Sequence, residues 1–144
     1  MADAPSKAIL EALAAALRTI TVANGYRTDL GLNVRTERSE TGLPAAPRCT
    51  VAVTGKVKAP NGQQRPSKGR GIRGVIEFEV PASYADAAAQ VLAADEDIDR
   101  LLTDVYTQMP DALPVEYDET IFLDRPEGFP VIAAEVHWST GYRR

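Results

Sequence analysis

The sequence predicts an α+β domain in which two helical segments pack on one face of an antiparallel or mixed sheet of about four to five strands. Two stretches carry apolar residues at helical spacings of three and four, whereas shorter stretches are rich in β-branched and aromatic residues. Their order is helix, three strands, helix, two strands, which is not the alternation of a parallel α/β fold. With 144 residues the chain is long enough to bury a core, and we expect one domain over 1–144.

The first helix is expected over 6–23, where Ile9, Leu13 and Leu17 fall on one apolar stripe. The alanines between them supply helix propensity. An Asn-Gly pair at 24–25 then predicts the end of the helix, because both residues tolerate the left-handed conformation that follows many helices.

Three strands are expected next, over 32–36, 48–57 and 74–80. The first alternates apolar and polar residues, and the second is rich in β-branched residues. In the third, Ile76 and Phe78 face one way and the glutamates beside them face the other. This alternation is typical of an antiparallel sheet with one face in water.

A polar segment over 59–71 separates the second and third strands. Its two prolines and three glycines predict a long, mobile loop rather than a tight hairpin. We refer to it as the basic loop, because it and its flanks gather Lys56, Lys58, Arg65, Lys68, Arg70 and Arg73.

The second helical segment is expected over 83–108, and its acidic cluster at 95–99 contains Asp95, Asp97 and Asp99. The cluster indicates either a solvated helix face or a break between two helical pieces, the second starting on acids that favour a helix N-terminus. Two final strands are expected over 120–123 and 131–138, joined by a turn that holds a proline and a glycine.

Charge is divided unevenly along the chain. Residues 1–80 carry 12 Lys and Arg against 7 Asp and Glu, whereas residues 81–144 carry 4 against 13. These balances, +5 and −9, give the net charge of −4. Oppositely charged halves can form one basic and one acidic face, through which copies meet each other or a partner. We therefore expect the basic loop to reach the acidic surface of a neighbouring subunit; a DNA-facing loop and a solvated linker are the alternatives.

Three glycines, Gly69, Gly71 and Gly74, form the GxGxxG pattern of dinucleotide-binding turns. Such a turn follows a strand and opens a helix, so that backbone N–H groups meet the pyrophosphate. Here the pattern leads into a strand, so a flexible loop is the preferred interpretation and no cofactor is expected.

The aspartates at 95–99 have the spacing of the first ligands of a calcium loop. Such a loop needs glycine at its sixth position and glutamate at its twelfth, where this chain has Arg100 and Tyr106. The single histidine, His137, lacks the companion ligands of a zinc site and is expected to be a half-buried strand residue or an interface hydrogen-bonding group. No metal site is expected.

Cys49 is the single cysteine, so it forms no internal disulfide, which fits a reducing compartment. We expect it to be a small packing residue rather than a nucleophile, because no base can be assigned to it. Trp138 and Tyr142 are either packing residues or interface anchors, since aromatic residues are enriched in binding hot spots. The candidate interface residues are Lys56, Lys58, Arg65, Lys68, Arg70, Arg73, Asp95, Asp97, Asp99, Trp138 and Tyr142.

Four stretches resemble the tail terminator proteins of long-tailed phages with non-contractile tails, of the lambda minor tail protein U type. The opening helix is similar in SKAILEALAAALRTI, and the proline-led second strand in LPAAPRCTVAV. The strand that feeds an acidic helix is similar in GVIEFEVPASYADAA, and the last turn and strand in IFLDRPEGFPVIAAEVHWSTGYRR. The resemblance covers most of the chain in layout and rests on no catalytic motif.

The resemblance implies a structural virion protein that caps the tail tube once it reaches its final length. Members of the family form a sixfold ring on the last ring of tube protein and present a surface to the head-completion proteins, at the top of the tail near the neck. Assembly takes place in the host cytoplasm, and DNA passes through the ring lumen. The implied mechanism is binding, without catalysis or cofactor.

Two other functions are kept as alternatives. A tail-completion or neck protein has a similar size and form, and would bind the portal side of the head. A small nucleic-acid-binding module would use residues 56–73, although the acidic net charge argues against general nucleic-acid binding. An enzyme is the least favoured class, because no catalytic motif is recognised. No run of 18 apolar residues is present, so neither a membrane span nor a membrane partner is expected.

Overall fold

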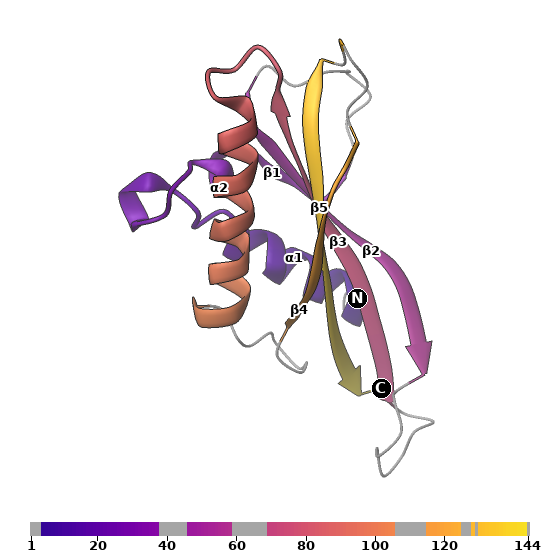
Figure 1. Ribbon diagram of the computed structural model, residues 1–144. Helices are drawn as coiled ribbons and strands as arrows, with labels where there is room; N and C mark the ends of the chain where they lie inside the picture. The colour runs from indigo at the N-terminus through magenta and orange to yellow at the C-terminus, as the bar shows by residue number, and fades with distance from the viewer. Residues whose placement is uncertain are drawn as a thin grey trace.

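The computed structural model describes residues 4–37, 46–58, 69–105, 115–124, 128 and 130–143. Its two helices and five-stranded mixed sheet confirm the predicted α+β class (Figure 1). The elements are α1 (Pro5–Leu17), β1 (Val34–Arg35), β2 (Arg48–Lys58), β3 (Gly69–Pro81), α2 (Ala87–Arg100), β4 (Glu116–Phe122) and β5 (Val131–Arg143). None of the described helices is both long and apolar enough to cross a membrane.

The strands lie in the order β1-β2-β3-β5-β4, so β1 and β4 form the two edges of the sheet. β1 runs parallel to β2, and every other neighbouring pair is antiparallel. The three central strands are much longer than the edge strands. Their far ends project beyond the helices, as the paired ends of β2 and β3 show in Figure 1.

The core lies between the sheet and the two helices. Phe78 and Ile76 of β3 and Trp138 of β5 are fully buried on the face that the helices cover. From the other side α1 contributes Leu13 and α2 contributes Ile98, also fully buried. The apolar face of the strands, where every second side chain points, therefore packs against the apolar stripes of the helices in one layer.

The first helix is shorter than predicted. α1 ends at Leu17, because the next hydrogen bonds span three residues instead of four, from the N–H of Ile20 to the carbonyl of Leu17 at 3.0 Å. A separate 3₁₀ turn follows over Val22–Asn24, and Gly25 closes that turn with a φ of 91°. The Asn-Gly stop signal is therefore real, but it ends the 3₁₀ turn rather than α1.

The strand predicted over 32–36 is reduced to the two residues of β1. The residues before it form a 3₁₀ turn, Leu30–Asn33, which leaves Leu32 exposed and buries Leu30 instead. The chain is held in this turn by Gly31, whose N–H donates to the carbonyl of Ile20 at 2.8 Å. The contact of Gly31 with the end of α1 thus outweighs the apolar–polar alternation over 32–36 that predicted a longer strand.

The basic loop was predicted too long, because Gly69–Gly71 belong to β3. They form ladders with Val57 and Lys58 on one side and with Gly141 on the other. Residues 59–68 lie outside the described residues. β4 and β5 are likewise longer than predicted, at 116–122 and 131–143.

The second helix begins at Ala87, later than predicted, after Asp86 takes a left-handed φ of 53°. It continues unbroken through the acidic cluster at 95–99, so the suggested break is wrong. A π-helical turn over Leu101–Val105 extends it, and the predicted residues 106–108 lie outside the described ranges.

Replacing Gly31 by alanine is expected to destabilise the fold. A Cβ there would lie 2.6 Å from the carbonyl oxygen of Leu17 and 2.7 Å from those of Arg18 and Ile20. These are backbone atoms, so relief requires moving the end of α1, at a cost of about 1–3 kcal/mol. Chemical denaturation would measure the loss. Gly55→Ala is the matched control, because a Cβ at Gly55 meets nothing within 4 Å; equal losses in the two variants would contradict the close-approach argument.

Candidate functional site

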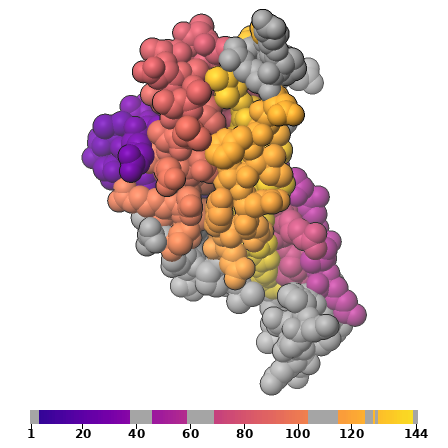
Figure 2. Space-filling model, in the orientation of Figure 1, coloured from indigo at the N-terminus to yellow at the C-terminus, as the bar shows by residue number. Residues whose placement is uncertain are grey.

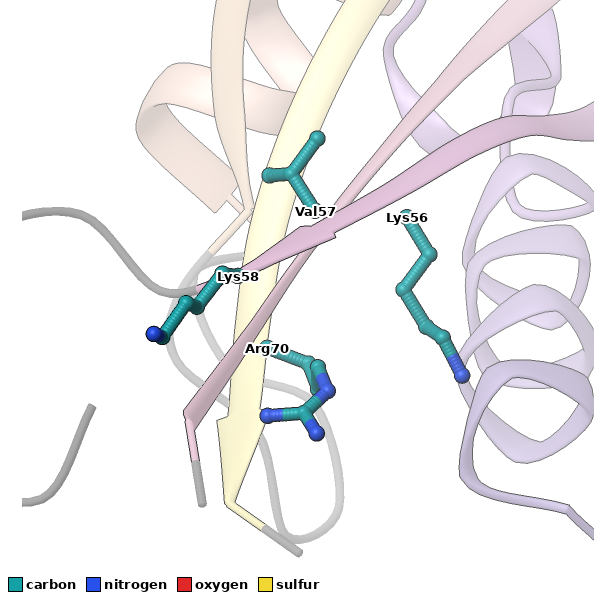
Figure 3. Close-up of a pocket in the computed structure, with 4 residues that line it drawn as sticks. All are labelled: Lys56, Val57, Lys58 and Arg70. Carbon is teal, nitrogen blue, oxygen red and sulfur yellow. The ribbon is translucent and has the colours of Figure 1, made fainter. Parts of the chain in front are cut away.

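Basic side chains gather at the projecting ends of β2 and β3. Lys56, Val57, Lys58 and Arg70 line an open hollow of about 360 Å³ (Figure 3). Lys58 pairs with Arg70 across the two strands, so both lie on the same face of the sheet. Val57 lies on the opposite face, over Gly71. The structure thus brings three of the predicted basic residues together at one surface.

The position of this hollow follows from the sheet register. Lys56 pairs with Ile72, which is fully buried on the helix-covered face, so the three cations continue that face beyond the helices. Arg73 is exposed on the opposite face. Arg65 and Lys68 lie outside the described residues. Three cations around one hollow favour an anionic partner, whether carboxylate or phosphate.

Two acids of α2 lie partly at the surface, and each accepts a hydrogen bond within the chain. Asp95 accepts from the hydroxyl of Thr120 in β4 at 2.6 Å, which ties α2 to the sheet edge. Asp99 accepts from the hydroxyl of Thr103 one turn later, at 2.8 Å. Both remain half-buried and can still contribute negative potential to the helix surface.

Asp97 differs from these two acids, because only 2% of it is exposed in the chain. Its carboxyl oxygens accept from the backbone N–H of Arg27 at 2.9 Å and of Thr28 at 2.8 Å, and from the Thr28 hydroxyl at 2.7 Å. Arg100 donates to the carbonyl of Gly25 at 2.9 Å and lies over the ring of Tyr26. The acid therefore fixes the turn after α1 to α2.

Trp138 and Tyr142 are packing residues in this chain. Trp138 is fully buried at the centre of the core, and Gly74 beside it leaves room for the indole, because a Cβ at Gly74 would collide with the ring. Tyr142 pairs with Arg70 across β3 and β5 and is 9% exposed. Both side chains therefore pack within the chain, and their role as interface anchors stays a prediction.

His137 is half-buried on the sheet face that points away from the helices, where it pairs with Glu119 of β4 and Val75 of β3. The Nε2 atom of His137 is buried and has no hydrogen-bond partner among the described residues. Within the described ranges, no group of three or more His, Cys, Asp or Glu is placed to hold a metal ion.

The exposed edge strand β4 was missed as a functional candidate. Glu116, Asp118 and Glu119 are exposed along it, and at its end Ile121, Phe122 and Leu123 are 39%, 49% and 39% exposed. Figure 2 shows this strand at the surface beside α2. Acidic residues next to apolar ones on an exposed edge strand are a signal for a binding edge, but the sequence does not reveal that the strand lies at an edge.

Asp97→Ala is expected to lower the free energy of unfolding by about 3 kcal/mol, because buried donors lose a charged acceptor. Asp99→Ala is the matched control, since Asp99 accepts a local bond from an exposed side chain. Urea denaturation of both variants would measure the difference. A loss in Asp97→Ala no larger than in the control would contradict the role assigned to Asp97.

Cys49 is expected to resist thiol reagents in the native protein. Burial, with a smaller contribution from the charge of Glu77, raises the pKa of the Cys49 thiol from 9.0 to about 12. Near pH 8 the thiol is therefore neutral as well as inaccessible. Titration with a chromogenic disulfide should detect it only after denaturation, and fast reaction of the folded protein would contradict this.

Comparison with known proteins gives a likeness in fold. No family model matches the chain, and no curated protein matches it in sequence. The chain superposes on one from the virion of a native gene transfer agent particle, with a TM-score of 0.65, 16% identity, and coverage of 99% of this chain and 100% of the other. A second solved structure gives a TM-score of 0.51 at 13% identity, with coverage of 99% and 98%. The chain thus shares its whole fold with a component of a virion particle.

Proposed function

We propose that this chain is a structural virion protein that caps a phage-type tail tube at its final length and offers the surface for head joining. The observation that carries the proposal is the shared fold with a chain of a gene transfer agent virion, which extends over the full length of both chains. The resemblance of four stretches to tail terminator proteins supports the tail position.

The charge distribution supports assembly as a ring. Basic residues occupy the projecting strand ends, Lys56, Lys58 and Arg70, whereas acids lie on α2 and β4. Such a molecule can join copies head to tail through two different surfaces, and a contact of this kind closes into a ring if the rotation fits. The ring, a hexamer by the family resemblance, sits on the tail tube protein and receives the head-completion protein on its other side.

The proposed action is occupation of a surface, without turnover or cofactor. A bound ring removes the site to which the next ring of tube protein would add. A neck protein is the closest alternative; it would join the head without controlling tail length.

The cationic hollow favours a second candidate, binding of nucleic acid. Phosphate contacts by Lys56, Lys58 and Arg70 would give an affinity that falls steeply with salt. A duplex-binding titration of the full chain at two salt concentrations tests it. Binding that is lost in Lys58→Glu and retained in Lys7→Glu would favour this candidate over the ring.

Deleting the gene for this chain is expected to give tails longer than normal that do not join heads, because tube polymerisation then lacks its stop. Electron microscopy of the particles would measure tail length directly. Restoring the chain from a plasmid should restore both length and joining.

Tails of normal length that fail to join heads would instead support the neck protein. Normal tails on normal particles would contradict both proposals. Purified chain added to growing tubes should stop growth at about one ring per tube.

A further inference from the structure

Two strand edges of this sheet have no partner strand in the part of the chain that the structure describes. β1 pairs with Cys49 and Thr50 alone, so the outer edge of β2 is uncovered over 51–58. β4 pairs with β5 on one side and forms the opposite edge of the sheet. Each uncovered edge presents unpaired backbone N–H and C=O groups, which can add another strand.

The two edges carry opposite charge. The uncovered edge of β2 holds Lys56 and Lys58, both exposed. The edge strand β4 holds Glu116, Asp118 and Glu119, all exposed. Like charges disfavour pairing of β2 with a second β2, or of β4 with a second β4, whereas β2 and β4 of different copies attract.

The two edges are also matched in position along the sheet. Glu116 of β4 pairs with Ser139 of β5, which pairs with Arg73 of β3. Arg73 in turn pairs with Gly55 of β2, so Glu116 and Gly55 lie at the same position along the strands. At its other end β4 lies level with Cys49 of β2, where β1 is already bound. If β4 of one copy is shifted by about two residues along β2 of the next copy, it passes β1 and lies beside the uncovered edge of β2. Closed sheets require a stagger of this kind between their strands.

We propose that β4 of one copy pairs with the uncovered edge of β2 in the next copy, so that one sheet continues through the assembly. The pairing is antiparallel, because β4 and β2 run in opposite directions within one sheet and rotation about an axis along the strands preserves direction. This inference takes the ring from the proposed function, whereas the two uncovered strand edges are observed independently of that function.

Both faces of the joined sheet gain favourable contacts. With the two-residue stagger, Phe122 of β4 lies opposite Val51 on the helix-covered face. On that face Lys56 lies opposite Tyr117 and approaches the acids of the neighbouring α2, because Asp95 accepts from Thr120 of β4 and Asp99 follows one helical turn later on the same side. On the other face Glu119 approaches Arg73, since Gly55 has no side chain to separate them.

A charge exchange tests the pairing. Variant A carries Lys56→Glu and Arg73→Glu, and variant B carries Asp99→Lys and Glu119→Lys. Each variant alone has two edges of like charge, so self-association in sedimentation velocity should weaken by at least about tenfold relative to the wild type. A mixture of A and B should associate again, because each edge of A then meets an opposite edge of B.

Matched controls place the same changes of net charge on the helices and the turn after α1. Arg18→Glu with Arg27→Glu and Glu11→Lys with Glu96→Lys should associate like the wild type. Thermal melts of every variant should match the wild type, which separates loss of pairing from loss of folding. Self-association of A or B alone at wild-type strength, or no recovery in the mixture, would overturn the proposal.

A covalent trap detects a weakly populated pairing. With the stagger above, Val57 of one copy lies opposite Glu116 of the next, and Cys49 is buried and does not interfere. The double variant Val57→Cys with Glu116→Cys, treated with a short bismaleimide at high protein concentration, should give a ladder of multimers. Each single variant should give no ladder. A wild-type chain that stays monomeric, together with a double variant that gives no ladder, also overturns the proposal.

The test separates this inference from the function on which it rests. Pairing is read in solution, with no tube or particle present, whereas the terminator function is read from tail length. Overlong tails in the deletion without edge pairing would refute the inference alone. Edge pairing with normal tails in the deletion would refute the function alone.

Discussion

The buried carboxyl group of Asp97 ties the parts of this fold together. Its oxygens accept three hydrogen bonds from Arg27 and Thr28, so the segment after α1 cannot move without leaving buried donors unpaired. That segment leads to Gly31, which fits closely against the carbonyls at the end of α1 and just after it, and β1 follows. One acid of α2 thereby holds the segment that connects α1 to the first edge strand of the sheet.

The rest of the sheet follows from burial on one side. Helices cover the face that holds Phe78 and Trp138, whereas the long ends of β2, β3 and β5 extend past them. The short β1 and the exposed β4 leave both edges uncovered among the described residues. Arg48 and Glu79, at the start of the β2–β3 ladder, form an ion pair at 3.0 Å on the other face. A buried core is therefore combined with two strand edges that have no partner strand among the described residues, as the proposed assembly requires.

Much of the fold could be predicted from the sequence, because periodicity reports burial directly. The stripe of α1 and the alternation in β3 were correctly assigned, and so was the fold class. Boundaries were less accurate where a distant contact decides them. The glycines at 69–71 look like a loop, yet pairing with β5 makes them strand. The acids at 95–99 look like one solvated set, yet Asp97 is buried, whereas Asp95 and Asp99 are half-buried and Glu96 is exposed.

The sequence by itself determined the α+β class, the basic and acidic halves of the chain, and the packing role of Cys49, since these depend on composition and local spacing. The tertiary structure decided which charged residues share a surface. Lys58 and Arg70 meet because β2 and β3 pair in one register, and Asp97 is withdrawn from the surface because the 25–28 turn folds onto α2. It also decided that β4 is an edge. Strand order depends on pairing between residues far apart in the chain, and local sequence does not encode it.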